Sequence, residues 1–519
     1  MTSKGIIAAG HGATAGAARV ILDEGGNAFD AALAALLAAC VAEPILTSLG
    51  GGGFLLARPA AGDRGGETVI YDFFAQTPKK RRLEADFFPI TADFGTAQQE
   101  FHIGMGSIAT PGTVKGLFAV HRDLGSMPLA RIVEPALALA RGGLVLNGLQ
   151  AYIFGVVGAI YTANAACRDV FASRHDPARP IGEGETLVMP QLADSIEALA
   201  REGEDLFYLG EIGQRIVADC GAGGGHLTVR DLADYRVRKR APLCLDYRDA
   251  RLSTNPPPSA GGILVAFSLE LLRHAEIGTG AFGGADHLAL LARVMDLTNK
   301  ARVDSKLHAT DGAPSELLNP DFIAAYRSQV LGRPAAKRGT THVSIIDARG
   351  NAASLSLTNG EGSAYIVPAT GIMLNNMLGE EDLNPHGFHQ WPGDRRLCSM
   401  LTPTLILRAD GRLAVMGSGG SNRIRTAILQ TLVNTLDFAM TLEDAVSRPR
   451  IHFEGGLLSI EPGFDNPSTA ALEADFPKTQ HWQERNMFFG GVHAVEFEPS
   501  RRRFSGVGDA RRDGVVIRA

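Results

Sequence analysis

A predicted β-hairpin in the second half of the chain places the strongest constraint on its fold. Two runs rich in strand-forming residues, 340–346 and 352–358, flank a loop of five residues, 347–351. Gly350 and Asn351 in this loop tolerate the unusual backbone angles that a hairpin connection needs. The pattern therefore predicts two antiparallel strands and makes Thr340 the first residue of the pair.

Thr340 gives this hairpin a chemical interest beyond its fold. A threonine hydroxyl is a poor nucleophile unless a base lies beside it, and a threonine with a free α-amine carries that base covalently. The amine of Thr340 is free only if the Gly339-Thr340 bond is cut. Gly339 suits such a bond, because a residue without Cβ tolerates strained backbone. On these residues alone, an ordinary hairpin whose threonines are simply strand formers remains an alternative.

Further motifs accompany the hairpin along nearly the whole chain. In chain order the motifs are Gly25–Ala32, Glu43-Pro44, Gly50–Phe54, Thr110–Thr113, Pro256–Gly262, Gly339–Ser344, Gly371–Asn376, Pro403-Thr404 and Arg511–Gly514. Together they resemble the γ-glutamyltranspeptidase family of N-terminal-nucleophile hydrolases. The resemblance implies an α+β protein with the family's four-layer αββα sandwich, and helical patterns early in the chain with strand patterns around the hairpin fit that fold.

The resemblance also implies that the chain cleaves itself. The Thr340 hydroxyl would attack the Gly339 carbonyl, and water would then release a large subunit, 1–339, from a small subunit, 340–519. We expect the two to remain one intertwined unit, and an assembly of two such heterodimers is left open. In the mature enzyme Thr340 would attack an amide while its α-amine, with an ordinary pKa of about 7.7 to 8.0, accepts the proton. Water or an acceptor amine would resolve the acyl-enzyme.

Three residues match the rest of the family's catalytic machinery. Thr358, on the return strand, matches the threonine that hydrogen-bonds the nucleophile. Gly419 and Gly420, at the start of a predicted helix, match the pair whose backbone N–H groups stabilise the oxyanion. The local spacing would let the glycine assignment shift by one residue.

Substrate contacts follow from the same resemblance. Glu380 matches the acidic contact to the substrate α-amine. Ser399, preceded by Cys398 where the family has another serine, matches a contact to the substrate carboxylate. The family's asparagine two places after Thr358 is replaced by Gly360 here, so we assign the neighbours Asn359 and Glu361 to the substrate site.

The chain departs from the family at the residue that holds the substrate carboxylate. The family has an arginine in an Asp-x-Arg-Glu-like segment, whereas this chain has Phe74 there, within 72–78. Loss of the bidentate guanidinium contact should weaken γ-glutamyl binding. Arg423 or Arg425 could supply the missing cation, or both could face solvent on their helix.

Three functions remain open at this point. The first is a self-processing γ-glutamyltransferase or glutathione hydrolase. The second is an acylase of another amide, comparable to cephalosporin or glutaryl acylases, which Phe74 favours and Glu380 disfavours. The third is a catalytically silent scaffold with the same fold, against which the presence of Thr340, Thr358 and the glycine pair speaks.

Composition excludes several other classes. With 56 acidic and 50 basic residues the net charge is -6, which provides no basic surface for nucleic acid or an anionic membrane. Five widely separated cysteines predict no disulfide framework. His386 and His389 are interrupted by Pro385 and Gly387, so we expect loop histidines, with no metal and no cofactor.

The first residues contain no apolar segment long enough for a signal peptide, and the apolar run 31–42 is too short to span a bilayer. We therefore expect a cytoplasmic protein and a buried helix at 31–42. Between residues 113 and 335 we expect mostly helix, with amphipathic segments at 128–142, 190–202, 284–304 and 315–330.

Overall fold

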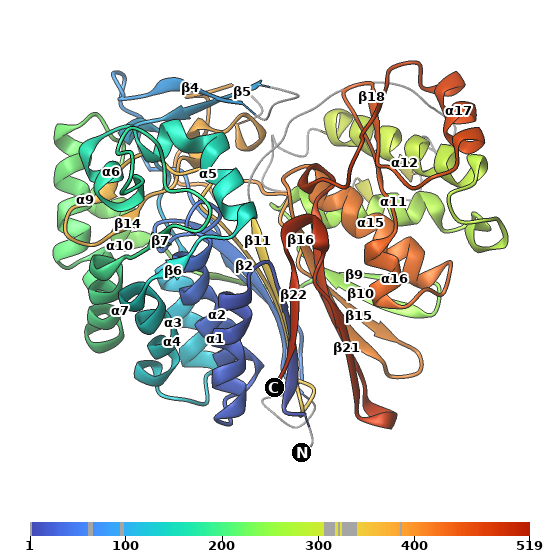
Figure 1. The fold of residues 1–519 in the computed structure, drawn as a ribbon, viewed down its shortest axis with the longest axis horizontal. Helices are drawn as coiled ribbons and strands as arrows, with labels where there is room; N and C mark the ends of the chain where they lie inside the picture. The colour runs from blue at the N-terminus through green and yellow to red at the C-terminus, as the bar shows by residue number, and fades with distance from the viewer. Residues whose placement is uncertain are drawn as a thin grey trace.

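Two antiparallel β-sheets packed face to face form the centre of the computed structural model (Figure 1). The structure describes residues 3–60, 66–93, 98–305, 317–319, 322–323, 340–384 and 387–519. The first sheet has the strand order β22 (Val515–Arg518), β1 (Gly5–Ala9), β11 (Thr341–Asp347), β12 (Ala352–Thr358), β2 (Gly52–Arg58), β3 (Val69–Phe73), β8 (Arg238–Arg240). The second has the order β21 (Arg503–Val507), β20 (Gly491–Glu498), β16 (Leu413–Gly419), β15 (Thr404–Arg408), β10 (Ala250–Thr254), β9 (Leu243–Tyr247).

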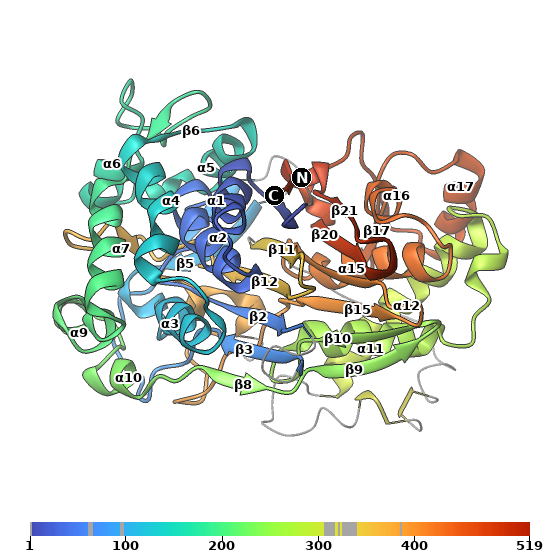
Figure 2. The same cartoon turned by 90° about the horizontal axis from the view of Figure 1, so that it is seen from below.

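Helices cover the outer face of each sheet (Figure 2). The first sheet is covered by α1 (Gly12–Asp23), α2 (Ala28–Ala42) and α3 (Thr113–Leu124), with α4 (Leu129–Gly142) packed on α1 and α2. The second is covered by α11 (Ala260–Leu272), α15 (Arg423–Leu436) and α16 (Leu442–Ser447), with α12 (Ala285–Asp304) packed on α11. The four layers confirm the αββα sandwich expected from the sequence.

Smaller elements surround the two helical layers. Beside the first sheet lie β4 (Phe88–Asp93), β5 (Gln98–Ile103), β6 (Leu144–Val145), α5 (Gly148–Tyr161), α6 (Ala165–Phe171), β7 (Thr186–Leu187), α7 (Pro190–Glu202), α8 (Asp205–Tyr208), α9 (Glu211–Ala222), α10 (Val229–Asp234), β13 (Ile366–Val367) and β14 (Ile372–Met373). Beside the second lie β17 (Ile451–Glu454), β18 (Leu457–Ile460), α17 (Asn466–Asp475) and β19 (Thr479–His481).

The hairpin β11–β12 is central to the first sheet, and its side chains alternate between two environments. Val343, Ile345 and Leu355 pack in the apolar cluster shared with helix α2. On the opposite face, the Ser344 hydroxyl donates a hydrogen bond to the carbonyl of His493 in the second sheet, at 3.0 Å. Because successive strand residues point to opposite faces, one face of the hairpin holds the helical layer and the other holds the second sheet.

Helix α2 is buried along its whole length, as its apolar sequence predicts. It begins with a capping box, in which the Asn27 side chain accepts from the Asp30 N–H and the Asp30 carboxylate accepts from the Asn27 N–H. It ends at Ala42, before Glu43 and Pro44. No helix in the described part of the chain combines the length and the apolar character needed to cross a membrane.

Strands from before and after residue 339 lie side by side in both sheets. In the first sheet β11 pairs with β1, and β12 pairs with β2. In the second, β10 pairs with β15. The two ends of the chain also meet, because β1 pairs with β22 (Figure 1). Neither segment, taken alone, contains either of the two central sheets in full.

Most of the elements expected from the sequence are present, with one clear error. The helices at 128–142, 190–202 and 284–304 and both hairpin strands are confirmed. The expectation of mostly helix up to residue 335 is wrong for 238–254, which form β8, β9 and β10. These strands are short and the first two are partly exposed at sheet edges, so they lack a continuous apolar pattern. The helix expected at 315–330 falls largely outside the described residues.

Candidate active site

Thr340 lies immediately before β11, at the end of the first sheet that faces strand β16 of the second. Its side chain is 4% exposed. A Cβ atom added to Gly419 would stand 2.2 Å from the Thr340 carbonyl oxygen. The two backbones therefore approach so closely that only glycine fits at position 419. Gly339, the other half of the expected cleavage point, lies outside the described residues.

Thr358 lies next to Thr340 across the hairpin. Thr341 pairs with Leu357, so one further step of the same register brings Thr358 opposite Thr340. The Thr358 hydroxyl accepts a hydrogen bond from the Gly360 N–H at 3.1 Å. On its other side Thr358 pairs with Gly52, at the start of β2. The structure thus brings the two threonines predicted to be catalytic to the same end of the hairpin.

A turn with two left-handed residues follows strand β16. Gly419 ends the strand, Gly420 has φ +115° and Ser421 has φ +52°, and helix α15 begins at Arg423. Among the described residues, none accepts a hydrogen bond from the N–H of Gly420. This N–H group lies at the positive end of a helix of 14 residues, which is suited to stabilise an anion. Both predicted glycines are therefore beside Thr340, but the turn itself starts at Gly420.

Arg512 is a functional candidate that sequence reasoning did not single out. The side chain is 5% exposed, and its Nη1 donates to the Thr340 carbonyl oxygen at 3.4 Å. Burial lowers its pKa to about 10. The sequence marked the motif 511–514, but it gave no way to separate Arg512 from Arg511. Arg511 instead pairs with Glu461 and Asp509.

The side chain of His342 forms a buried hydrogen-bond network two residues after Thr340. Its Nδ1 lies 2.8 Å from the Ser356 hydroxyl and its Nε2 lies 2.9 Å from the Ser344 hydroxyl. Complete burial lowers the pKa of His342 well below its ordinary value, so the imidazole is neutral. A Cβ on Gly417 would stand 2.3 Å from the ring. This network fixes β11 against β16 directly below the site.

Glu43 fixes strand β11 from the side of the helical layer. The Thr341 hydroxyl donates to Glu43 Oε2 at 2.6 Å, and the Thr14 hydroxyl donates to Oε1 at 2.8 Å. Glu43 is 1% exposed. The carboxylate that follows helix α2 therefore fixes the residue after Thr340, which explains the Glu43-Pro44 motif in physical terms.

Predicted substrate residues gather around Gly360. Asn359, Glu361 and Glu380 are all buried. Gly360 has φ +65°, and a Cβ there would stand 2.2 Å from Asn376 Oδ1 and 2.3 Å from Glu380 Oε1. Neither side-chain heteroatom of Asn359 has a hydrogen-bond partner within the described parts of the chain. The carboxylates of Glu361 and Glu380 and the amide of Asn359 are thus buried around Gly360, two residues after Thr358.

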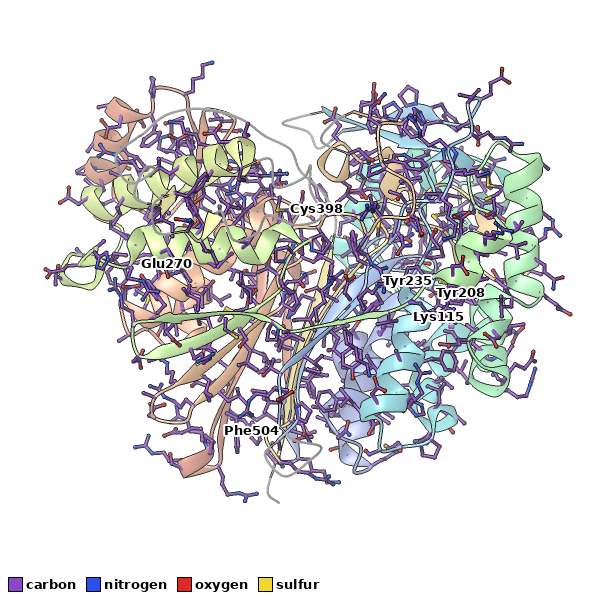
Figure 3. All side chains as sticks on the ribbon, turned by 180° about the vertical axis from the view of Figure 1, so that it is seen from behind. Lys115, Tyr208, Tyr235, Glu270, Cys398 and Phe504 are labelled. Atoms are coloured by element: carbon purple, nitrogen blue, oxygen red, sulfur yellow. The ribbon has the colours of Figure 1, made fainter. Side chains whose placement is uncertain are left out.

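Cys398 and Ser399 lie at the start of the segment that leads into β15. The Ser399 hydroxyl accepts from the Leu401 N–H at 3.1 Å, and its carbonyl accepts from the Ala260 N–H at 2.8 Å. Burial raises the pKa of the Cys398 thiol to about 11, so it stays protonated. Figure 3 shows Cys398 near the upper end of the sheets, far from Phe504 at the lower end.

Phe74 lies in the apolar core. It is 1% exposed and stacks on Phe54, with ring centroids 5.3 Å apart. The arginine that comes nearest to this position is Arg396, which donates to the Phe74 carbonyl and pairs with Asp72 at 3.4 Å. Arg396 also lies 4.7 Å above the ring of Tyr235. Its ion pair with Asp72 and its contact with Tyr235 give Arg396 a structural role beside Phe74.

An aromatic ladder continues from Arg396 into the helical layer (Figure 3). Tyr235 stacks on Tyr208 at 6.1 Å, and Lys115 Nζ lies 4.8 Å above the Tyr208 ring. The Tyr208 hydroxyl donates to the Pro111 carbonyl at 3.0 Å. This ladder fastens the 72–78 segment to the Thr110–Thr113 motif and to helix α8.

Arg423 and Arg425 are both buried, so the expectation that they could face solvent is wrong. Arg425 lies 3.7 Å from Glu454 and donates to Asn299. Arg423 instead lines a cavity of about 500 Å³, together with Glu361 and Arg512. Of the two, Arg423 is the cation placed to meet a small molecule.

His389 stacks edge-on against Phe87 at 4.4 Å, whereas His386 lies outside the described residues. Within the described ranges, no group of three or more His, Cys, Asp and Glu side chains is arranged to hold a metal ion.

Comparisons with known proteins agree with this geometry. Residues 14–519 match the family model described as gamma-glutamyltranspeptidase. The glutathione hydrolase proenzyme of Escherichia coli (strain K12) is 31% identical over 498 residues, which cover 88% of this chain and 82% of that protein. The acylase ACY 1 proenzyme of Pseudomonas sp. (strain V22) is also 31% identical, over 542 residues that cover 99% of this chain and 93% of that protein.

The fold is likewise similar to a solved structure. The crystal structure of cephalosporin acylase from Bacillus halodurans superposes with a TM-score of 0.85 at 23% identity, covering 99% of this chain and 96% of that one. Relatives with hydrolase names and relatives with acylase names are thus equally similar to this chain.

Proposed function

The chain belongs to the gamma-glutamyltranspeptidase family of N-terminal-nucleophile enzymes, and on that premise we propose that Thr340 is its nucleophile after cleavage of the Gly339-Thr340 bond. The observation that carries this proposal is the position of Thr340, buried at the end of the central hairpin against Gly419 and Arg512. Its neighbours match the needs of acyl transfer: a second threonine, an N–H group at a helix start and a buried cation.

Self-cleavage would proceed by transfer of an acyl group from nitrogen to oxygen. The Thr340 hydroxyl attacks the Gly339 carbonyl, the peptide C–N bond breaks, and the nitrogen becomes the free α-amine of Thr340. Water then hydrolyses the ester and leaves a fragment of 339 residues and one of 180 residues (519 minus 339). Because both fragments contribute strands to both sheets, the fragments stay associated as one heterodimer.

Turnover uses the same hydroxyl on an external amide. The α-amine of Thr340 accepts the hydroxyl proton and passes it to the departing amine. The N–H of Gly420, at the start of helix α15, donates to the oxyanion of the tetrahedral intermediate, with Gly419 providing the close approach. Thr358 orients the nucleophile from the adjacent strand. Water or an acceptor amine completes the cycle on the acyl-enzyme.

For the acyl group, the first candidate is γ-glutamyl, as in glutathione. Glu361 and Glu380 supply two buried carboxylates near Thr358, and such carboxylates suit the α-ammonium of a γ-glutamyl group. Asn359 adds an amide that has no partner in the described structure. Cys398 and Ser399 would contact the substrate carboxylate in this scheme.

The second candidate is an amide with a different acyl group, and Phe74 favours it. At the position of the family's carboxylate-binding arginine this chain has a ring stacked in the core, and the adjacent Arg396 already pairs with Asp72. The cavity beside Arg423 offers an apolar volume that a γ-glutamyl group does not need.

Intact-mass measurement of the purified protein tests the nucleophile. We expect two fragments that meet between Gly339 and Thr340, and a single uncut chain for Thr340→Ala. Thr340→Ser is the matched control, since it retains a hydroxyl and should still cleave. If the wild-type chain of 54.9 kDa stays whole after long incubation, the silent-scaffold alternative replaces this proposal.

Rates on γ-glutamyl and glutaryl p-nitroanilides then decide between the two acyl groups. A γ-glutamyl preference supports the glutathione-type substrate. A glutaryl preference supports the acylase-type substrate.

A further inference from the structure

A cavity of about 500 Å³ lies between helix α5 and the segment 480–488, and Arg512 lies between it and the predicted nucleophile. Its volume is within the range of pockets that bind small organic molecules. Ile45, Leu46, Ile153 and Val157 form an apolar wall. The opposite side carries Arg512, whose guanidinium also contacts the Thr340 carbonyl oxygen. A molecule in this cavity is therefore one side chain away from Thr340.

Aromatic rings shape the outer part of the cavity. Trp482 and Phe488 stack with centroids 4.6 Å apart and an interplanar angle of 23°. The Arg423 guanidinium lies 4.8 Å from the centre of the Phe488 ring, and its Nε donates to the Phe488 carbonyl at 3.1 Å. These contacts fix a cation at the edge of an aromatic surface, a combination that suits a flat or branched apolar group with a negative charge at one end.

The burial of Arg512, together with its lack of an ion pair in the described structure, indicates a negatively charged ligand. The side chain is 95% buried, yet it forms no ion pair with any residue that the structure describes, and its Nε has no hydrogen-bond partner there. The neighbouring arginines differ, because Arg450 and Arg511 both pair with Asp509, at 2.7 Å and 3.1 Å. Glu361 also lines the cavity, and its carboxylate, like those of Asp509 and Glu43, favours the charged form of Arg512 at longer range. Burial still lowers the pKa of Arg512 to about 10, so an anion that reaches this guanidinium would stabilise it.

We propose that this cavity is the subsite for a carboxylate-bearing aromatic or branched aliphatic part of the substrate, with the carboxylate on Arg512 and Arg423 and the apolar body against Trp482 and the Ile153 wall. The proposal rests on the proposed role of Thr340, because it makes the cavity part of the substrate site. A guanidinium binds a carboxylate through two parallel N–H donors, so two arginines can orient the group as well as attract it.

Binding can be measured directly, because Trp482 is one of only two tryptophans. In a Trp391→Phe background, phenylacetate should change the Trp482 emission saturably, and phenylacetamide, its neutral analogue, should bind at least about ten-fold more weakly. Arg423→Gln should weaken phenylacetate binding at least about ten-fold and leave phenylacetamide unchanged. Arg293→Gln, on the exposed face of α12, is the matched control and should change neither.

Calorimetric titration of the wild-type chain gives the same comparison without the Trp391 substitution. Equal affinity for the acid and the amide, or an Arg423→Gln variant that binds phenylacetate like wild type, would overturn the proposal.

Two pairs of substrates decide which part of the substrate carries the carboxylate. Glutaryl and butyryl p-nitroanilides differ only on the acyl side, and N-butyryl-4-aminobenzoate and butyranilide differ only on the amine side. Arg423→Gln should lower kcat/KM at least about ten-fold for the charged member of one pair and spare its neutral partner. An equal loss for charged and neutral members would contradict the subsite.

The wild-type chain separates this proposal from that of the nucleophile. A wild-type chain that never cleaves, yet binds phenylacetate more tightly than phenylacetamide, would refute the nucleophile alone. An active, cleaved enzyme that does not discriminate phenylacetate from phenylacetamide would refute the subsite alone.

Discussion

The carbonyl oxygen of Thr340 lies against the α-carbon of Gly419, so that a Cβ there would be only 2.2 Å away. This contact joins the two sheets at the point where the predicted nucleophile begins its strand. Only a residue without a side chain permits it, which makes Gly419 a spacer between the sheets as well as a neighbour of the turn at Gly420.

Gly419→Ala should therefore slow or abolish self-cleavage. The new methyl group meets a backbone oxygen, which cannot move as a flexible side chain can, so Thr340 is displaced from the turn at Gly420. The fraction of cleaved chain over time, measured by intact mass, checks this. Gly16→Ala is the control, since no atom lies within 4 Å of its added Cβ, and it should cleave normally and gain up to about 1 kcal/mol of stability. Cleavage of Gly419→Ala at the wild-type rate would contradict the steric account.

Phe74→Arg tests whether position 74 can be restored to the family pattern. The side chain is stacked in the core beside Arg396, so a guanidinium there would be buried next to another cation. We expect a loss of about 3 kcal/mol or more in the free energy of unfolding. Phe74→Leu should lose only about 1 kcal/mol. Denaturant titration gives both values, and a stable Phe74→Arg variant that gains γ-glutamyl anilide hydrolysis would show that the side chain turns into the substrate site.

The burial of His287 predicts that the folded protein loses stability at acid pH. It packs on Phe438 at 4.9 Å, and burial lowers its pKa from 6.5 to about 4. The unfolded chain binds a proton below pH 6.5, whereas the folded chain does so only near pH 4, so the free energy of unfolding falls as pH drops through this window. The free energy of unfolding falls by about 3 kcal/mol across this window.

His287→Gln should flatten that part of the pH profile measured by denaturant titration. His175→Gln, at an exposed position, should leave the profile unchanged. If both profiles keep the wild-type slope, His287 does not titrate as its burial requires.

The cysteines should differ in their reaction with iodoacetamide. Burial holds the pKa of Cys398 at about 11, so little thiolate is present at neutral pH, whereas Cys244 is exposed. Peptide mapping after limited alkylation at pH 7.5 should find Cys244 labelled well before Cys398. Cys244→Ser should then remove the fast phase of labelling. Fast modification of Cys398 would mean that the segment before β15 opens in solution.

The hairpin and the positions of Thr340, Thr358 and Gly420 could be predicted from the sequence, because they depend on local patterns and on motifs in a fixed order. The sequence could not reveal Arg512 or the role of Glu43. Both act through contacts between residues far apart in the chain, 172 apart for Arg512 and Thr340 and 298 for Glu43 and Thr341.

Helix α15 shows why burial was harder to predict than helix position. Its sequence has an apolar stripe, which is typical of a helix with one exposed face. In the structure other elements cover it on all sides, and polar residues such as Gln430 and Arg425 are buried by bonding to β17 and α12. Polar side chains that satisfy one another inside a protein look, in a sequence, like side chains that face water.

The pairing of β1 with β22 brings the two chain ends together, with the Lys4 N–H donating to the Ala519 carbonyl at 2.7 Å. A short linker could join these ends, and translation could then start at Met-Thr340. An aminopeptidase that removed the initiator methionine would then expose the threonine amine, and the chain would not have to cleave itself. Such a circular permutant would separate the two reactions assigned to Thr340, since catalysis could be measured in a protein that had never needed to mature.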